Sequence, residues 1–109
     1  MANQKNILKI LKILSSKIKL DLIAHLFYCS CNECNVNDLT KIFKISQPNI
    51  SNNLIWLRRN KVIKYKILKK ERFYYLDEKF KEKYGNLISL LIKENQKYFE
   101  KLLCTCKNV

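Results

Sequence analysis

Hydrophobic residues recur at helical spacing from residue 7 to residue 43, which predicts three helices in this part of the chain. A first helix covers residues 7–14, and Ser15 or Ser16 is suited to cap a second helix that runs to Phe27. Asn35 can cap a third helix, with Asp38 near the positive end of that helix. The apolar faces expected for these helices are formed by Ile7, Leu8, Leu11, Leu14, Ile18, Leu22, Ile23, Leu26, Phe27, Leu39, Ile42 and Phe43.

The segment SQPNISNNLIWLRRNKVI predicts a fourth helix with two contrasting faces. Ser46 suits the N-cap, Pro48 suits the first turn, and Asn60 is expected to end the helix in the left-handed conformation. One face is an apolar stripe of Ile50, Leu54 and Leu57. The other face is polar and consists of Gln47, Asn49, Ser51, Asn52 and Asn53.

After this helix the pattern changes to β-branched and aromatic residues, which predicts a β-hairpin with strands at Val62–Ile67 and Arg72–Leu76. Helical spacing returns at Lys79 and continues to Leu103, preceded by the acidic pair Asp77–Glu78 at the expected helix start. The predicted inward side of this last helix is formed by Phe80, Tyr84, Leu87, Leu91, Tyr98 and Leu102. Because further apolar residues occupy the other side, we expect a homodimer built on the terminal helices.

The composition fits one helix-rich domain spanning residues 1–109. With one glycine and one proline the chain contains few helix breakers, and 48% of its residues are hydrophobic. It has neither an apolar run long enough to cross a membrane nor the pattern of a signal peptide, so a cytoplasmic location is expected. Paired catalytic carboxylates and a glycine-rich loop are also lacking, and an enzyme is not expected.

The element order α-α-α-α-β-β-α is that of a winged helix-turn-helix, in which the fourth helix enters the DNA major groove. A net charge of +13 is compatible with nucleic acid, although a general excess of lysine also contributes to it. Short polar side chains at the start of the recognition helix suit base edges, and basic residues around the hairpin suit phosphates. The candidate DNA contacts are Ser46, Gln47, Asn49, Ser51, Asn52, Asn53, Arg58, Arg59, Lys69, Lys70 and Arg72.

These motifs resemble the ArsR/SmtB family of bacterial metal-responsive repressors. The stretch VNDLTKIFKISQPNISNNLIWLRRNKVI is similar to the family's "V-x-D-L-x-x-x-L-x-x-S-Q-P-x-V-S-x-H-L-x-x-L-R-x-x-G-L-V", and FYYL resembles its "Y-Y-x-L" wing. The resemblance implies a homodimer that binds a palindromic operator and releases it when an inducer binds. This sequence departs from the family at Asn53, where His is usual, and at Lys61 and Lys69, where Gly is common.

All five cysteines lie in two short clusters, CSCNEC and CTC, and they are Cys29, Cys31, Cys34, Cys104 and Cys106. In a reducing cytosol such clusters favour metal binding or thiol chemistry over structural disulfides. A common family site is a Cys-x-Cys pair whose positions are Asn35 and Asn37 here, and a zinc site on the last helix would need a histidine that this helix lacks. The first cluster would therefore be a displaced inducer site.

Several chemistries fit these sulfurs. Three thiolates suit As(III) or Sb(III), and a fourth from the tail suits Cd(II), Zn(II), Pb(II) or Cu(I). The alternatives are a thiol oxidation or persulfide switch between the two clusters, a structural zinc site in a module that binds nucleic acid or protein, and cysteines that serve as small buried hydrophobes. The only histidine, His25, lies four residues before Cys29, where it is either a buried helix residue or a supporting group. The function expected from the sequence is a DNA-binding repressor released by a thiophilic ion.

Overall fold

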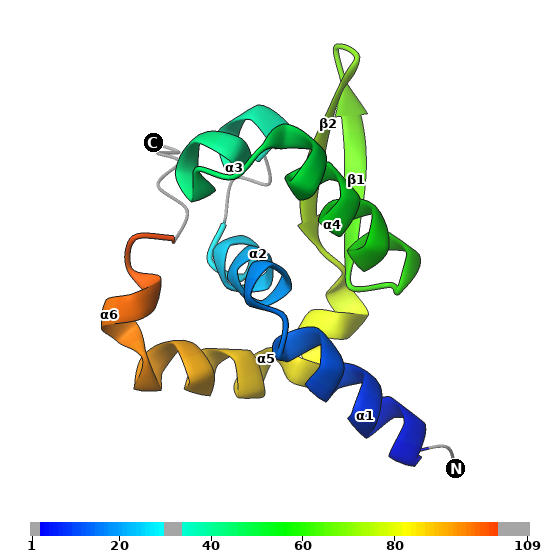
Figure 1. Cartoon of the computed structure of the whole chain (residues 1–109). Helices are drawn as coiled ribbons and strands as arrows, with labels where there is room; N and C mark the ends of the chain where they lie inside the picture. Colours follow the sequence, from blue (N-terminus) through cyan, green and yellow to red (C-terminus); the bar gives the residue numbers. More distant parts are fainter. Residues whose placement is uncertain (1–2, 30–33, 103–109) are drawn as a thin grey trace.

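The computed structural model describes residues 3–29 and 34–102, and their elements follow the predicted order of a winged helix (Figure 1). The helices and strands are α1 (Asn3–Leu14), α2 (Lys17–Phe27), α3 (Val36–Phe43), α4 (Gln47–Arg59), β1 (Ile63–Leu68), β2 (Glu71–Leu76), α5 (Glu78–Glu94) and α6 (Gln96–Phe99). The two strands form an antiparallel hairpin, and the predicted mainly helical fold with a small hairpin is confirmed. Among the described helices, none combines the length and apolar character that a membrane crossing requires.

Helix α2 is the centre of the hydrophobic core. It contacts α1, α4, α5 and β2, and Figure 1 shows it surrounded by these elements. Leu22, Ile23 and Ala24 are completely buried on it, as the helical spacing predicted for the first two. From the other side the apolar stripe of α4 completes the core, because Ile50, Leu54 and Leu57 are also completely buried. The buried stripe fixes which face of α4 remains exposed to solvent.

Two predicted N-caps hold the helix-turn-helix in place. The Asn35 side chain accepts a hydrogen bond from the Asp38 backbone N–H at 2.9 Å, and the Asp38 carboxylate accepts one in return from the Asn35 N–H, which completes a capping box. Ser46 Oγ accepts a hydrogen bond from the Asn49 N–H. Ser16 occupies the N-cap position of α2 without a side-chain hydrogen bond to the helix.

The predicted inward face of α1 is wrong. Ile10 and Ile13 are buried, whereas Ile7, Leu8 and Leu11 are each more than half exposed. Both sets recur at helical spacing, so the sequence pattern alone does not indicate which of them meets the core. The exposed set leaves an apolar stripe on the outer side of α1.

The single long helix predicted for residues 79–103 is also wrong, because it breaks at Asn95. This residue has a non-helical φ of −129°, and its side-chain amide donates to the Leu91 carbonyl at 2.9 Å, in competition with continuation of the helix. The side facing the core matches the expected one only in part. Phe80 of the expected side is buried, and Tyr84 and Leu102 pack against the core, but Leu87 and Tyr98 are exposed. Ile88, Ile92 and Phe99, from the other side, are buried.

Lysine occupies every left-handed position among the described residues: Lys44, Lys61, Lys69 and Lys70 have positive φ. The predicted left-handed end at Asn60 is therefore wrong, because Asn60 has a φ of −95° and the next residue makes the turn. The hairpin is one residue longer on each side of its tip than predicted. Leu68 pairs with Glu71, which leaves a two-residue turn of Lys69 and Lys70.

Asp77 joins the hairpin to α5 and should make folding stability dependent on pH. Burial alone would raise its pKa, but the Phe80 N–H and the Lys64 ammonium, 3.2 Å away, together lower the pKa below its ordinary value of 3.8. A carboxyl group whose pKa is lower in the folded state stabilises the fold above pH 3.8, and this contribution is lost as the pH falls below 3.8.

We therefore expect Asp77→Ala to destabilise the protein by about 1 kcal/mol at neutral pH, through the lost N-cap and ion pair. The gap between native and variant stability, measured by urea unfolding, should narrow as the pH falls below 3.8. Glu82→Gln on the exposed side of α5 is the matched control. A gap that stays constant down to pH 3 would contradict this reading of Asp77.

Candidate DNA interface and cysteine site

The start of α4 presents a row of polar side chains to solvent. Gln47, Asn49 and Asn52 are exposed, and Ser51 is half-buried, because the buried stripe of this helix faces α2. Short amide and hydroxyl side chains at this end of a recognition helix can reach base edges in a major groove. Four of the predicted contact residues thus lie where a base contact is geometrically possible.

A groove of about 590 Å³ separates the start of α4 from the hairpin. Its polar lining combines amide, hydroxyl and basic groups with one carboxylate, and it includes Asn35, Asn37, Gln47, Ser51, Lys70, Glu71 and Arg72. Figure 1 shows the tip of the hairpin extending well beyond the helices. The groove therefore joins the candidate base-reading residues to the candidate phosphate-binding residues.

Two predicted DNA contacts have structural roles. Asn53 donates to the Asn49 backbone carbonyl at 2.9 Å and to its side-chain oxygen at 3.0 Å, and it accepts from Lys19 Nζ at 3.0 Å. The same ammonium lies over the Trp56 ring, 4.7 Å from its centroid, and this ring packs against the core. Ser46 is engaged as the N-cap of α4. Asn53 therefore orients Asn49 and is poorly placed for reading a base.

One arginine of α4 and one of the hairpin lie over the same aromatic ring. The guanidinium groups of Arg58 and Arg72 lie over the Tyr65 ring, at 5.4 Å and 4.7 Å from its centroid. Such stacking orients the two guanidinium planes at little cost in solvation. Arg59 at the end of α4 and Lys69 and Lys70 at the hairpin tip are also exposed. This surface suits contacts with the phosphate backbone.

The described part of the cysteine site is a pair of buried sulfurs. The Sγ atoms of Cys29 and Cys34 lie 3.2 Å apart, and the two residues are 7% and 4% exposed. The other predicted sulfur ligands, Cys31, Cys104 and Cys106, lie outside the described residues. Among the described residues, no group of three or more His, Cys, Asp or Glu side chains has the arrangement of a metal site. Cys31, Cys104 and Cys106 therefore remain candidates for a third ligand to an ion.

His25 lies beside this pair and is completely buried. Its Nε2 is 3.3 Å from Cys34 Sγ, and its Nδ1 is 2.6 Å from the Leu102 carbonyl oxygen. The Phe43 ring meets the imidazole edge-on, with 5.8 Å between the centroids. Burial lowers the pKa of His25 below 6.5, although the Leu102 hydrogen bond opposes this shift, so the imidazole is neutral at pH 7. The four-residue spacing to Cys29 pointed to this histidine, but its contact with Leu102 had no sequence signal.

The cysteine site is connected to the wing by backbone hydrogen bonding. Cys34 forms a β-bridge with Tyr74 of β2, and its carbonyl accepts from the Tyr74 N–H at 2.9 Å. The next residue, Asn35, donates from its side chain to the Glu71 carboxylate at 2.7 Å while it caps α3. A displacement of Cys34 would therefore act on both the wing and the start of the helix-turn-helix. None of these wing contacts was expected from the sequence.

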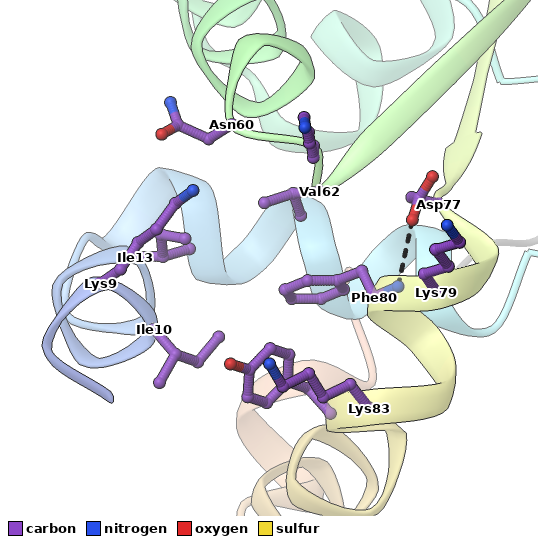
Figure 2. Close-up of a pocket in the computed structure, with 11 residues that line it drawn as sticks. Lys9, Ile10, Ile13, Asn60, Val62, Asp77, Lys79, Phe80 and Lys83 are labelled. Carbon is purple, nitrogen blue, oxygen red and sulfur yellow. Dashed lines mark hydrogen bonds between the residues drawn. The ribbon is translucent and has the colours of Figure 1, made fainter. Parts of the chain in front are cut away.

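A separate cavity of about 200 Å³ lies where α1, the α4–β1 turn and the start of α5 meet (Figure 2). Its walls are apolar, with Ile10, Ile13, Val62 and Phe80 among them, and lysines lie at its edge. The dashed line in Figure 2 is the hydrogen bond by which Asp77 caps α5. Residues of α1, the α4–β1 turn and α5 thus share one cavity.

Comparison with known proteins identifies the fold. Neither a protein-family profile nor a curated protein sequence matches the chain. Among solved structures, HlyU from Vibrio cholerae N16961 is 26% identical with a TM-score of 0.69, covering 84% of this chain and 92% of that one, and its reduced form also matches. The transcriptional regulator HlyU from Vibrio vulnificus CMCP6 is 24% identical, covers 84% and 88% of the two chains, and has a TM-score of 0.71.

The transcriptional repressor BigR from Xylella fastidiosa is 27% identical, with 84% of each chain covered and a TM-score of 0.69. These similarities each extend over 84% of this chain. The chain therefore has the winged-helix fold of bacterial transcriptional regulators.

Proposed function

We propose that this protein is a non-enzymatic transcriptional repressor that binds a palindromic operator as a homodimer and releases it when its cysteines react. One observation carries the DNA-binding part of the proposal. The exposed polar start of α4 adjoins the basic hairpin surface, on a fold shared with the regulator HlyU and the repressor BigR. A recognition helix with amide side chains and a basic wing is the arrangement that reads base edges and holds phosphates.

The apolar surface of the terminal helices supports the dimer. Ile7, Leu8 and Leu11 on α1 and Leu87 and Leu90 on α5 are between 38% and 58% exposed. Large apolar side chains gathered on terminal helices are a typical interface between subunits. Two copies related by a twofold axis would present two recognition helices, which explains the expectation of a palindromic operator.

A gel-shift assay with the DNA upstream of the protein's own gene tests the regulator. We expect a specific complex that survives competitor DNA and weakens steeply with salt, because phosphate contacts release counterions. Sedimentation of the same sample should give the mass of a dimer. A protein that binds every sequence equally would contradict the proposed regulator and favour a module that binds nucleic acid or protein around structural zinc.

We further propose that the Cys29–Cys34 pair is the core of the inducer site. Two adjacent sulfurs form a soft donor set that suits As(III), Sb(III), Cd(II), Zn(II) or Pb(II), with further thiolates from Cys31 or the tail cysteines. Binding would require both sulfurs to lose their protons, so affinity should rise with pH. The bridge from Cys34 to Tyr74 gives this site a direct connection to the wing.

Thiol oxidation is the second candidate, and the same distance favours it. The two sulfurs are 3.2 Å apart, so a bond of about 2.05 Å requires little movement. Oxidation could also pair the first cluster with Cys104 or Cys106. The two candidates differ in the reagent that should release DNA: a thiophilic ion in the first, and diamide or a persulfide in the second.

Replacing both cysteines should remove the response and leave DNA binding intact. We expect Cys29→Ser/Cys34→Ser to bind the operator within about threefold of the native affinity, because neither residue lies in the DNA-facing groove. Added As(III), Cd(II) or diamide should then release at least tenfold less DNA than from the native protein. Cys104→Ser/Cys106→Ser measures the contribution of the tail. A full response in Cys29→Ser/Cys34→Ser would exclude this pair as the sensor.

A further inference from the structure

The C-terminal end of the described chain is held on α2 by two polar contacts with matching spacing. The Tyr98 hydroxyl donates to the Asp21 carboxylate at 3.0 Å and 3.1 Å, and the Leu102 carbonyl meets His25 at 2.6 Å. Asp21 and His25 are four residues apart on one helix, as Tyr98 and Leu102 are on the other segment. Asp21 and His25 therefore lie on one face of α2. That face meets the end of α6 at Tyr98 and the turn after α6 at Leu102.

The hydrogen bonds of His25 fix its tautomer. A carbonyl oxygen can only accept, so Nδ1 must carry the proton that is shared with Leu102. In a neutral imidazole Nε2 then has a lone pair and must accept, and the partner 3.3 Å away is Cys34 Sγ. The thiol of Cys34 consequently donates its proton to Nε2. In this arrangement both ring nitrogens are satisfied in a completely buried position.

We propose that His25 is a positioning residue that couples the docking of the C-terminal segment on α2 to the presence of the thiol proton on Cys34. The inference rests on the proposed role of the cysteines as the sensor. It assigns to His25 a connection between the two cysteine clusters, because Leu102 precedes Cys104 by two residues.

Either inducer chemistry removes this proton from the sulfur. In a reaction with arsenite, each As–S bond forms as a hydroxide on arsenic leaves as water with the thiol proton. With diamide, Cys29 and Cys34 lose two protons and two electrons to the reagent, which becomes the hydrazine, and a disulfide forms. In both products Cys34 Sγ has only lone pairs to present to Nε2.

Two lone pairs then face each other in a buried site, and a neutral His25 has no arrangement that satisfies both neighbours. Only the imidazolium could donate to both, and a completely buried position disfavours that charge. If the ring keeps its proton on Nδ1, Nε2 lies against the sulfur lone pairs without a donor. If the proton moves to Nε2, Nδ1 becomes an acceptor and faces the Leu102 oxygen 2.6 Å away. Release of the Leu102 carbonyl to water relieves this conflict. Residues 99–102 would therefore leave α2 when Cys34 reacts, while the bridge to Tyr74 transmits the same event to the wing.

Nitrogen-15 NMR of the imidazole tests the tautomer directly, because His25 is the only histidine in the chain. In the reduced protein at pH 7 we expect a protonated Nδ1 and a pyridine-type Nε2. One equivalent of diamide should change this pattern and, in parallel, accelerate amide hydrogen exchange at residues 99–102 by about tenfold, the size expected for one buried hydrogen bond. A pattern that diamide leaves unchanged in fully oxidised protein would overturn the proposal.

Two amide variants separate the two hydrogen bonds. The side-chain amide of Asn approximates Nδ1, so His25→Asn should keep the Leu102 contact and lose the Cys34 contact. Exchange at residues 99–102 should then be slow both before and after diamide. The longer Gln side chain reaches toward the Nε2 position, so His25→Gln should give fast exchange in both states. If His25→Asn still showed diamide-dependent exchange, the coupling would not pass through this residue.

Tyr98→Phe is the matched control, since it loosens the same segment through Asp21 without touching the thiol site. It should raise exchange in both redox states and preserve the further increase on diamide. All of these measurements are made without DNA. A protein that failed to bind an operator but showed the coupled tautomer change would refute the proposed regulator and leave the His25 inference intact. A protein that bound its operator but showed no tautomer change would refute the His25 inference and leave the regulator intact.

Discussion

A Gln47→Ala protein is expected to lose about 1–3 kcal/mol of operator affinity per half-site, or roughly 5- to 150-fold, with little change in nonspecific binding. Gln47 is the first residue of α4, is exposed, and lines the groove toward the hairpin. A glutamine amide can donate to and accept from an adenine edge, and alanine can do neither. The folded state should be unaffected, because the Ser46 cap and the buried stripe of α4 remain.

Asn53→Ala is the informative comparison for this prediction. Gln47 and Asn53 are equally good candidates by sequence, but the Asn53 amide is already engaged by Asn49 and Lys19. We expect its replacement to lower affinity modestly for all sequences by loosening Asn49, and to leave base preference unchanged. Fluorescence anisotropy on operator and scrambled DNA measures both quantities. If Asn53→Ala lost more discrimination between operator and scrambled DNA than Gln47→Ala, the groove would not be the base-reading surface.

Local signals explain which elements were predictable from the sequence. The helix-turn-helix was predictable because caps and core spacing agree: Asn35 and Ser46 cap α3 and α4, and Ile50, Leu54 and Leu57 are buried. The hairpin was predictable from its β-branched and aromatic residues. In each of these segments one periodicity dominates.

The errors fall where two readings of the sequence compete. Helices α1 and α5 are apolar on more than one side, so periodicity did not decide between Ile7 and Ile10, or between Leu87 and Ile88. The break at Asn95 depends on a side-chain hydrogen bond to the Leu91 carbonyl, which helical spacing does not reveal. Apolar residues that a subunit interface would need obscure the face that meets the core.

The sequence predicted which residues form the cysteine site, but it did not predict which residues surround them. Sequence spacing brought Cys29 and Cys34 together as candidate ligands, and their sulfurs are indeed adjacent. The contacts of Cys34 with Tyr74 and of His25 with Leu102 join residues 40 or more positions apart, and only the packed fold determines them. These long-range contacts are the ones that would connect an inducer to the wing and to the C-terminal segment.

Lys69 and Lys70 at the wing tip are expected to stabilise a DNA complex while destabilising the free protein. Their φ values are 52° and 71°, as in a two-residue turn in which both central residues are left-handed. Asn and Gly are favoured there, since a side chain with a Cβ costs about 1–2 kcal/mol in this conformation. Lysine relieves none of that strain, but two ammonium groups at an exposed tip are suited to phosphates.

Lys69→Asn/Lys70→Gly should therefore raise the free energy of unfolding by about 1–2 kcal/mol and lower DNA affinity. Losing two phosphate contacts per protomer should make the slope of log K against log salt less steep by about 1.8 per protomer. Lys69→Gln/Lys70→Gln removes the same charges and retains the strained backbone, so it should lose the same affinity without gaining stability. Urea unfolding and salt-dependent anisotropy on both variants separate backbone strain from charge. If the Gln variant kept native affinity, the wing tip would not contact phosphate, and lysine at these two strained positions would serve no DNA-binding purpose.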